Sequence, residues 1–143
     1  MKAGILVPAF FAQGEPMELG TMHHVAIIVS DMEKAKEFYV KKLGFEIIHD
    51  LYRPEQGDYR LDVKKGTIRL EIFGKKDAPI RVTNPEAQGL RHLAFYVEDV
   101  EAAALELNAL GIETEPIRID PLSGQKCTFF RDPDHLPLEL YGG

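Results

Sequence analysis

The feature that most constrains the fold of this chain is an internal repeat. The segment His24-Val-Ala-Ile-Ile-Val-Ser-Asp31 matches His92-Leu-Ala-Phe-Tyr-Val-Glu-Asp99, and Leu70-Glu-Ile-Phe-Gly74 matches Leu138-Glu-Leu-Tyr-Gly142. One and the same offset relates position 24 to position 92 and position 71 to position 139. The histidine and the glutamate are therefore equally far apart along the chain in both halves. Two copies of one supersecondary unit, in the same register, are expected.

Apolar residues change their spacing in the same order along both halves. They first alternate, over residues 25–29 and 93–97, which predicts a strand whose preceding histidine lies on the face away from the core. They then recur at helical spacing over residues 32–43 and 100–110. Three short strands are expected after each helix, at residues 45–51, 59–63 and 67–73 in the first half and at 113–119, 126–131 and 137–141 in the second.

Polar residues and glycines mark the ends of both predicted helices. Ser30 and Glu33 have the spacing of a capping box at the start of the first helix. Asp99 is the expected N-cap of the second helix. Gly44 and Gly111 are placed to end the two helices, since glycine readily adopts the left-handed conformation at a C-terminus.

These elements predict an α+β chain made of two tandem βαβββ modules. Residues 22–74 form the first module, residues 75–89 a linker and residues 90–143 the second module, after an N-terminal arm at residues 1–21. A length of 143 residues suits one domain built from two half-size units.

Charge and cysteine content exclude several classes of partner. The formal net charge is −6, so the field of the chain repels nucleic acid and anionic membranes, and neither is an expected partner. Pro8 interrupts the apolar stretch at residues 4–12, and no secretory cleavage site follows it. Cys127 is the only cysteine, which excludes an intrachain disulfide. A cytoplasmic protein is expected.

The sequence also predicts a homodimer. Half-modules of this kind have open sheet edges, and such edges are normally paired or covered. The apolar arm at Gly4 to Phe11 is expected to dock on the protein and to contribute to this assembly.

Four polar residues occupy equivalent places in the two halves. If a pseudo-twofold axis relates the modules, His24, Glu71, His92 and Glu139 line one concave surface. Two imidazoles and two carboxylates suit a divalent ion, and Zn²⁺, Ni²⁺, Co²⁺, Mn²⁺ and Fe²⁺ are all admissible. His23 competes with His24 but has no histidine partner at the equivalent position of the second half.

Longer segments resemble a known superfamily. HHVAIIVSD, EKAKEFYVKKLGFE, IRLEIFG, GLRHLAFYVEDVEAA and FFRDPDHLPLELYG look like the vicinal oxygen chelate superfamily of glyoxalases, bleomycin-resistance proteins and extradiol dioxygenases. The resemblance covers about residues 22–142 and is strongest to small bacterial glyoxalase I-like proteins. It implies a cupped mixed sheet around a metal, with Zn²⁺ or Ni²⁺ favoured. It implies the ligands His24, Glu71, His92 and Glu139.

The resemblance further implies a reaction on a small-molecule substrate. Glyoxalase I (lactoylglutathione lyase) isomerises the thiol adduct of a 2-oxoaldehyde through an enediolate. Glu139 is then the expected base, with Glu71 as ligand and second candidate base. The family residues that hold the carboxylates of glutathione are replaced here by Ile28 and Lys75, so another thiol can be the co-substrate.

Basic residues could bind another anionic substrate, although most are expected to be solvated surface residues. The candidates are Arg53, Arg60, Arg69, Arg91 and Lys126. Arg69 is the most interesting, because it has the strand parity of Glu71.

Three other functions fit the same superfamily. An extradiol-type dioxygenase or a fosfomycin-type thiol transferase needs only three protein ligands, such as His24, His92 and Glu139. A binding protein of the bleomycin-resistance type needs none. Glu71, as a fourth ligand, argues against the dioxygenase and the thiol transferase. The presence of all four candidate ligands argues against the binding protein.

Overall fold

The computed structural model describes residue 4 and residues 14–143. In chain order the elements are β1 (Val25–Val29), α1 (Met32–Ala35), η1 (Lys36–Lys42), β2 (Glu46–Arg53), β3 (Asp58–Lys65), β4 (Ile68–Gly74), β5 (Leu93–Val97), α2 (Val100–Ala109), β6 (Arg118–Ile119), β7 (Lys126–Arg131) and β8 (Pro137–Gly142). This order confirms the α+β class and the two tandem βαβββ modules. The docking expected for the apolar arm falls on residues 5–11, which lie outside the described residues.

Each module contains one four-stranded mixed sheet. The strand order is β1-β4-β3-β2 in the first module and β5-β8-β7-β6 in the second. The pairs β1/β4 and β5/β8 are parallel, and the other neighbours are antiparallel. Ala26 lies opposite Glu71, and Ala94 lies opposite Glu139. The register expected from the repeat is therefore confirmed at the parallel pair of both modules.

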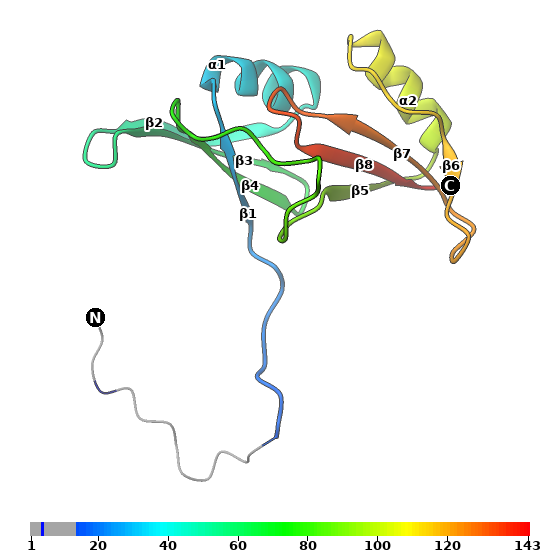
Figure 1. Cartoon of the computed structure of the whole chain (residues 1–143), viewed down its shortest axis with the longest axis horizontal. Helices are drawn as coiled ribbons and strands as arrows, with labels where there is room; N and C mark the ends of the chain where they lie inside the picture. The colour runs from blue at the N-terminus through cyan, green and yellow to red at the C-terminus, as the bar shows by residue number, and fades with distance from the viewer. Residues whose placement is uncertain (1–3, 5–13) are drawn as a thin grey trace.

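The helices lie on the same side of the two sheets in the view of Figure 1. One apolar cluster beneath them includes Val29 and Ile72 of the first module and Leu138 and Leu140 of the second. Burial of each such side chain contributes roughly 1.5–3 kcal/mol to folding. The opposite faces of the strands are thereby left for polar chemistry.

The two modules also contact each other through the first helix. The ring centroids of Phe38 in η1 and Phe130 in β7 are 6.3 Å apart. The hydroxyl of Tyr39 donates a 2.7 Å hydrogen bond to the buried carboxylate of Asp132. The hydroxyl of Ser30 donates a 2.6 Å bond to Asp134. Apolar and polar contacts thus join the modules.

The first helix is capped by a different residue from the one expected. Asp31, not Ser30, accepts hydrogen bonds from the backbone N–H groups of Glu33 and Lys34. The capping-box prediction was wrong because Ser30 bonds to Asp134 instead. The expected cap of the second helix is confirmed, since Asp99 accepts from the N–H of residue 102 at 3.0 Å.

One strand is shorter than expected. The segment 113–119 contributes only β6, at Arg118–Ile119. Pro116 lies within this segment and has no N–H to donate to a sheet, which explains the interruption.

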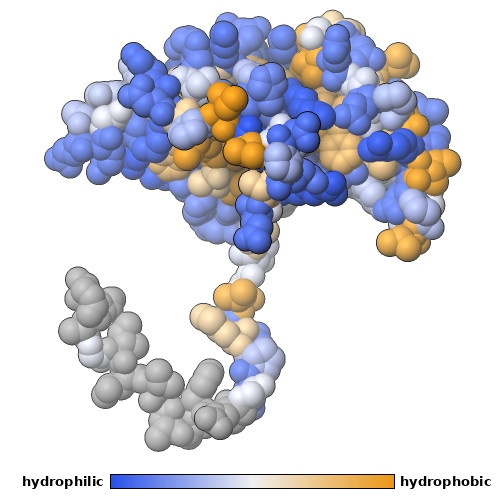
Figure 2. Space-filling model, viewed as in Figure 1, coloured by the Kyte–Doolittle hydropathy of each residue, from blue (hydrophilic) through white to orange (hydrophobic). Residues whose placement is uncertain are grey.

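Hydrophilic side chains cover most of the face seen in Figure 2. Within residue 4 and residues 14–143, no helix has both the length and the apolar character needed to cross a membrane.

Candidate metal centre

Each module brings one histidine and one glutamate together. Nε2 of His24, just before β1, lies 3.4 Å from Oε1 of Glu71 in β4. Nε2 of His92, just before β5, lies 3.1 Å from Oε1 of Glu139 in β8. The side chains of a strand alternate between its faces, so both pairs lie opposite the buried aliphatic residues.

The separation within each pair suits two ligands of one metal ion. Two donor atoms that each lie about 2.1 Å from an ion are about 3.0 Å apart at a right angle and about 3.4 Å apart at a tetrahedral angle. The observed 3.1 and 3.4 Å span this interval. Imidazole and carboxylate are also the donors that borderline divalent ions accept. Each pair therefore has the chemistry and the spacing of half a metal site.

The ring of His24 is held from its other side. Its Nδ1 lies 2.8 Å from Nδ1 of His23, so the two rings share a hydrogen bond. A hydrogen bond at the second ring nitrogen is a common way to orient a metal-binding histidine. The contact with His23 leaves Nε2 of His24 facing Glu71.

The two pairs do not combine into one cluster within a single chain. Among the described residues, no three His, Cys, Asp or Glu side chains are grouped closely enough to hold an ion together. The structure thus brings His24 to Glu71 and His92 to Glu139, but leaves the first pair apart from the second.

Glu71 lies among charged groups. Nη2 of Arg60 is 3.1 Å from Oε2 of Glu71, on the oxygen that does not face His24. Arg60 also donates two hydrogen bonds to Asp62, at 2.9 and 3.1 Å. Burial alone would raise the pKa of Asp62, but its bonds to Arg60 and His49 outweigh this effect and lower it. A network of charges thus fixes Glu71 in place.

Glu139 has fewer charged neighbours than Glu71 in the described part of the chain. Phe129 is its neighbour across the β7–β8 pair, and the rings of Phe129 and His92 pack in a T-shaped arrangement at a centroid distance of 5.0 Å. His92 is the sole ion-pair partner of Glu139 in the described part of the chain. Burial, together with the Glu139 carboxylate, raises the pKa of the Cys127 thiol. Within the same part of the chain, no arginine or lysine forms an ion pair with Glu139.

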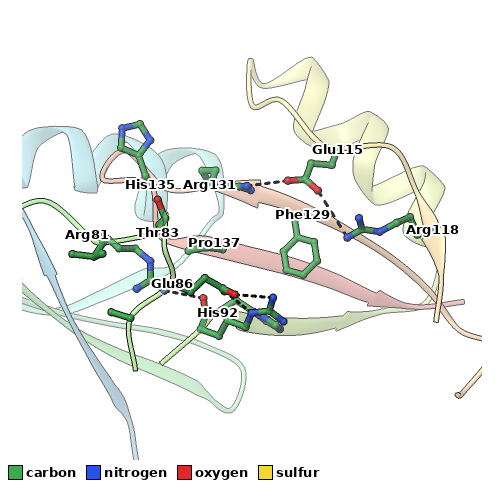
Figure 3. A pocket seen from close by; sticks show the side chains of 13 residues that line it. Arg81, Thr83, Glu86, His92, Glu115, Arg118, Phe129, Arg131, His135 and Pro137 are labelled. Carbon is green, nitrogen blue, oxygen red and sulfur yellow. Dashed lines mark hydrogen bonds and ion pairs between the residues drawn. The ribbon is translucent and has the colours of Figure 1, made fainter. Parts of the chain in front are cut away.

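A cavity of about 460 Å³ opens beside the second pair (Figure 3). His92, Phe129 and Pro137 line it, together with the linker residues Arg81 and Glu86. The cavity gives a small molecule access to the His92 side of the site.

Most of the basic residues expected as candidate anion binders are paired with carboxylates. Arg53 is bound to Asp58, Arg60 to Asp62, Arg91 to Glu86 and Lys126 to Glu101. Arg69 does share a strand with Glu71, but its buried Nε has no hydrogen-bond partner among the described residues.

Three arginines that line the cavity were not predicted from the sequence: Arg81, Arg118 and Arg131. Arg81 belongs to the linker and Arg118 to the two-residue strand β6, where no repeat or alternation identifies them. Phe129 was also missed, although the hairpin pairing of β7 with β8 places it opposite Glu139.

The chain is similar to known proteins over most of its length. Residues 21–140 match the family model described as Glyoxalase/Bleomycin resistance protein/Dioxygenase superfamily. The Bacillus subtilis protein called uncharacterized protein YwkD is 57% identical over 126 residues, which cover 87% of this chain and 98% of the relative. The crystal structure of a glyoxalase family protein from Enterococcus faecalis is 54% identical, with a TM-score of 0.83 over 85% of this chain and 96% of the other.

More distant relatives carry named activities. Human mitochondrial methylmalonyl-CoA epimerase is 33% identical over 98 residues, covering 66% of this chain and 56% of the enzyme. Lactoylglutathione lyase of Schizosaccharomyces pombe is 25% identical over 83% of this chain and 46% of the enzyme. A point mutant of the fosfomycin resistance protein FosX of Listeria monocytogenes, crystallised with Mn(II), shares the fold at 20% identity and a TM-score of 0.68, over 88% of this chain and 92% of FosX.

Proposed function

Because the chain belongs to the glyoxalase/bleomycin resistance protein/dioxygenase superfamily, we propose that it is a metal-dependent enzyme that moves a proton on a carbon next to a carbonyl group. The observation that carries this proposal is the pair of equivalent His–Glu contacts, at 3.4 Å and 3.1 Å. Members of the superfamily bind divalent metals, and FosX does so with Mn(II).

His24, Glu71, His92 and Glu139 would hold the ion, for which Zn²⁺ or Ni²⁺ is our first expectation. When bound, the ion would polarise a carbonyl group of the substrate and so make the hydrogen on the adjacent carbon more acidic. The protein residues then have to hold the substrate, accept the proton and return it.

Glu139 is the better candidate for the base. Arg60 and His24 each occupy one oxygen of Glu71, so Glu71 is held as a ligand. Glu139 has an oxygen that no arginine or lysine of the described chain approaches within ion-pair distance. A general base needs a free lone pair within reach of the proton, and Glu139 keeps one. Glu71 is the second candidate.

The specific reaction we favour is that of a glyoxalase I-like lyase, which acts on the thiol adduct of a 2-oxoaldehyde. Glutathione is not the first expectation for the thiol, because Ile28 is apolar and Lys75 is bound to Asp58 at 2.8 Å. Epimerisation is the second candidate, favoured by the 33% identity to an epimerase. Both reactions begin with removal of a proton next to a carbonyl.

We propose that the complete site is shared between two copies of the chain. The two pairs of one chain do not form a cluster among the described residues, and β1 and β5 are each an unpaired edge of a four-stranded sheet there. A symmetric dimer can place the first pair of one copy against the second pair of the other. This arrangement covers open edges and assembles four ligands at each of two sites.

Solvent exchange tests the reaction on several substrate classes at once. The protein, loaded with Zn²⁺ or Ni²⁺, is incubated in D₂O with hemithioacetals of several thiols and with branched acyl thioesters. We expect deuterium to enter one substrate class at the carbon next to the carbonyl, as observed by NMR. Metal-loaded protein that exchanges no proton in any of them would contradict the proposal and favour a binding protein.

Complementation tests the shared site. One variant carries His24→Ala and Glu71→Gln, and the other carries His92→Ala and Glu139→Gln. If the site is shared, dissociating and remixing the two inactive proteins restores about a quarter of wild-type activity, because half of the dimers then have one intact site. A site built within one chain would regain nothing.

A further inference from the structure

We propose that the cavity beside His92 is a subsite for a dianionic, phosphate-type group of the substrate, held by Arg81 and Arg118. The inference rests on the proposed function, because it assigns a substrate class to the same site. It is carried by the distribution of charge around the cavity.

The cavity wall is basic although the chain is acidic. The formal net charge of the chain is −6. The charged residues that line the cavity, histidines apart, are the four arginines Arg81, Arg91, Arg118 and Arg131 and the two glutamates Glu86 and Glu115, which leaves a net charge of +2. A concave surface of one sign attracts ligands of the other sign. A dianion matches the excess.

Two of the four arginines are neutralised by the glutamates. Arg91 donates two hydrogen bonds to Glu86, at 2.6 and 3.0 Å. Arg131 donates one to Glu115 at 2.9 Å (Figure 3). Bidentate and short charge-assisted bonds of this kind compete effectively with a ligand. The excess charge must therefore lie on the other two arginines.

Arg81 and Arg118 carry that excess. Arg118 is 3.9 Å from Glu115, whose other oxygen is bound to Arg131, and the Arg118 side chain is 60% exposed. Arg81 forms no ion pair with a carboxylate of the described chain, and its Nη2 donates to the backbone oxygens of residues 90 and 91, both at 2.9 Å. Its Nε is buried without a partner among the same residues. Both guanidinium groups retain donors for an oxyanion.

Phe129 connects this charge to the candidate metal centre. Its ring centroid is 5.7 Å from Cζ of Arg118 and 5.0 Å from the centroid of the His92 ring. The Arg118 guanidinium and the His92 imidazole therefore both contact one aromatic ring. One small molecule can contact Arg118 with its acidic end while its carbonyl group lies near His92.

The first module also contains arginines that lie over an aromatic ring, but their charge is neutralised. Arg53 and Arg60 lie over the ring of Phe73, at 4.9 and 5.5 Å from its centroid. Each is bound to a buried aspartate, Asp58 or Asp62. Their charge is neutralised within the protein, so we place the anion subsite in the second module alone.

The test is a titration of the full chain, as purified, with inorganic phosphate at constant ionic strength. Binding is followed by the Nε–Hε signals of the arginines in ¹H–¹⁵N spectra. We expect saturable shifts at Arg81 and Arg118, and an affinity about tenfold lower in Arg118→Gln and in Arg81→Gln, since each removes a charged hydrogen-bond donor. Acetate is expected to bind more weakly than phosphate, because it carries one charge.

Two control variants separate the subsite from general charge effects. Arg91→Gln combined with Glu86→Gln removes a neutralised ion pair of the same cavity and keeps its net charge, and Arg53→Gln removes a neutralised arginine from the first module. Both variants are expected to change phosphate affinity less than twofold. Phosphate binding that does not saturate would overturn the proposal. Wild-type phosphate affinity in Arg118→Gln would also overturn it, because the phosphate would then be bound to the metal and not to Arg118. Acetate bound as tightly as phosphate would overturn the assignment to a dianion.

The outcomes also distinguish this inference from the proposed reaction. Phosphate binding needs no turnover, so saturable binding at Arg81 and Arg118 without proton exchange retains the subsite and rejects the reaction. Proton exchange without phosphate binding retains the reaction and rejects the subsite. Because Arg118 is largely exposed, Arg118→Gln is expected to fold, and a thermal melt verifies this.

Discussion

In the first module, the carboxylate of Glu71 contacts Arg60, and Asp62 lies opposite it across the β3–β4 pair. In the second module, Phe129 takes the place opposite Glu139. The backbone register at the two glutamates is the same, with an alanine across the parallel pair. Two equivalent glutamates thus lie in different surroundings, because the residue opposite each one on the neighbouring strand is charged in the first module and apolar in the second.

The largest expected effect separates the two glutamates. Glu139→Gln should lower substrate proton exchange by about 10² to 10⁴, because glutamine can still offer an oxygen to the metal but cannot accept a proton. Glu71→Gln should instead act mainly by weakening metal binding. Deuterium incorporation at saturating metal and elemental analysis of the bound metal measure the two effects. His92→Ala, which should lose both, is the control. Full turnover of metal-loaded Glu139→Gln would transfer the role of base to Glu71.

The next effect concerns the junction between the modules. Tyr39→Phe removes the hydroxyl that donates to the buried carboxylate of Asp132. Loss of a partner for a buried acceptor should lower the free energy of unfolding by about 1–3 kcal/mol in urea denaturation. Tyr141→Phe is the matched control, since its bond to Asp120 is less buried and should cost less. An equal loss in the free energy of unfolding for both variants would indicate that the contact between the modules stabilises the fold no more than a surface hydrogen bond.

Acid should distinguish the modules. Bonds to Arg53 and Lys75 hold the pKa of Asp58 well below its usual range, and the pKa of Asp62 is also lowered. A lowered pKa stabilises the fold above about pH 4 and loses this effect as the pH falls toward the folded-state value. Burial raises the pKa of Asp132. Its effect on stability has the opposite sign, because protonation of Asp132 at low pH favours the folded state.

Protection factors from hydrogen exchange should therefore fall more in β3 than in β7 between pH 6 and pH 3. Asp58→Asn is expected to remove part of the pH dependence in the first module. A uniform loss of protection across both sheets would show that the modules unfold as one unit and would remove this distinction between them.

The smallest effect compares the two β-hairpin turns. The turn between β3 and β4 contains Gly66 at φ +59°, whereas the turn between β7 and β8 contains His135 at φ +68°. A left-handed conformation costs a non-glycine residue about 1 kcal/mol. His135→Gly should therefore raise the thermal midpoint by about 3 °C, and Gly66→Ala should lower it by a similar amount in calorimetry. A lower midpoint for His135→Gly would mean that the imidazole makes a stabilising contact.

Much of the fold follows from patterns that are local in the sequence. Alternation over residues 25–29 and 93–97 was enough to place the histidines opposite the buried face. Helix caps were less secure, because Ser30 and Asp31 can both accept a backbone N–H, and only the contact of Ser30 with Asp134 decides between them. The interrupted strand before β6 could have been found from Pro116.

The two modules, their common register and the identity of the His–Glu pairs could all be predicted from the amino-acid sequence. These features depend on periodic burial and on a constant offset between the two copies, which any repeat of one structural unit preserves. The folded chain was needed to show that the two pairs stay apart among the described residues, and that Arg60 holds Glu71 while Glu139 faces Phe129. Folding also gathers Arg81 of the linker and Arg118 of β6 around one cavity. Charge acts through space, so its effect depends on distances between segments that no periodicity in the chain records.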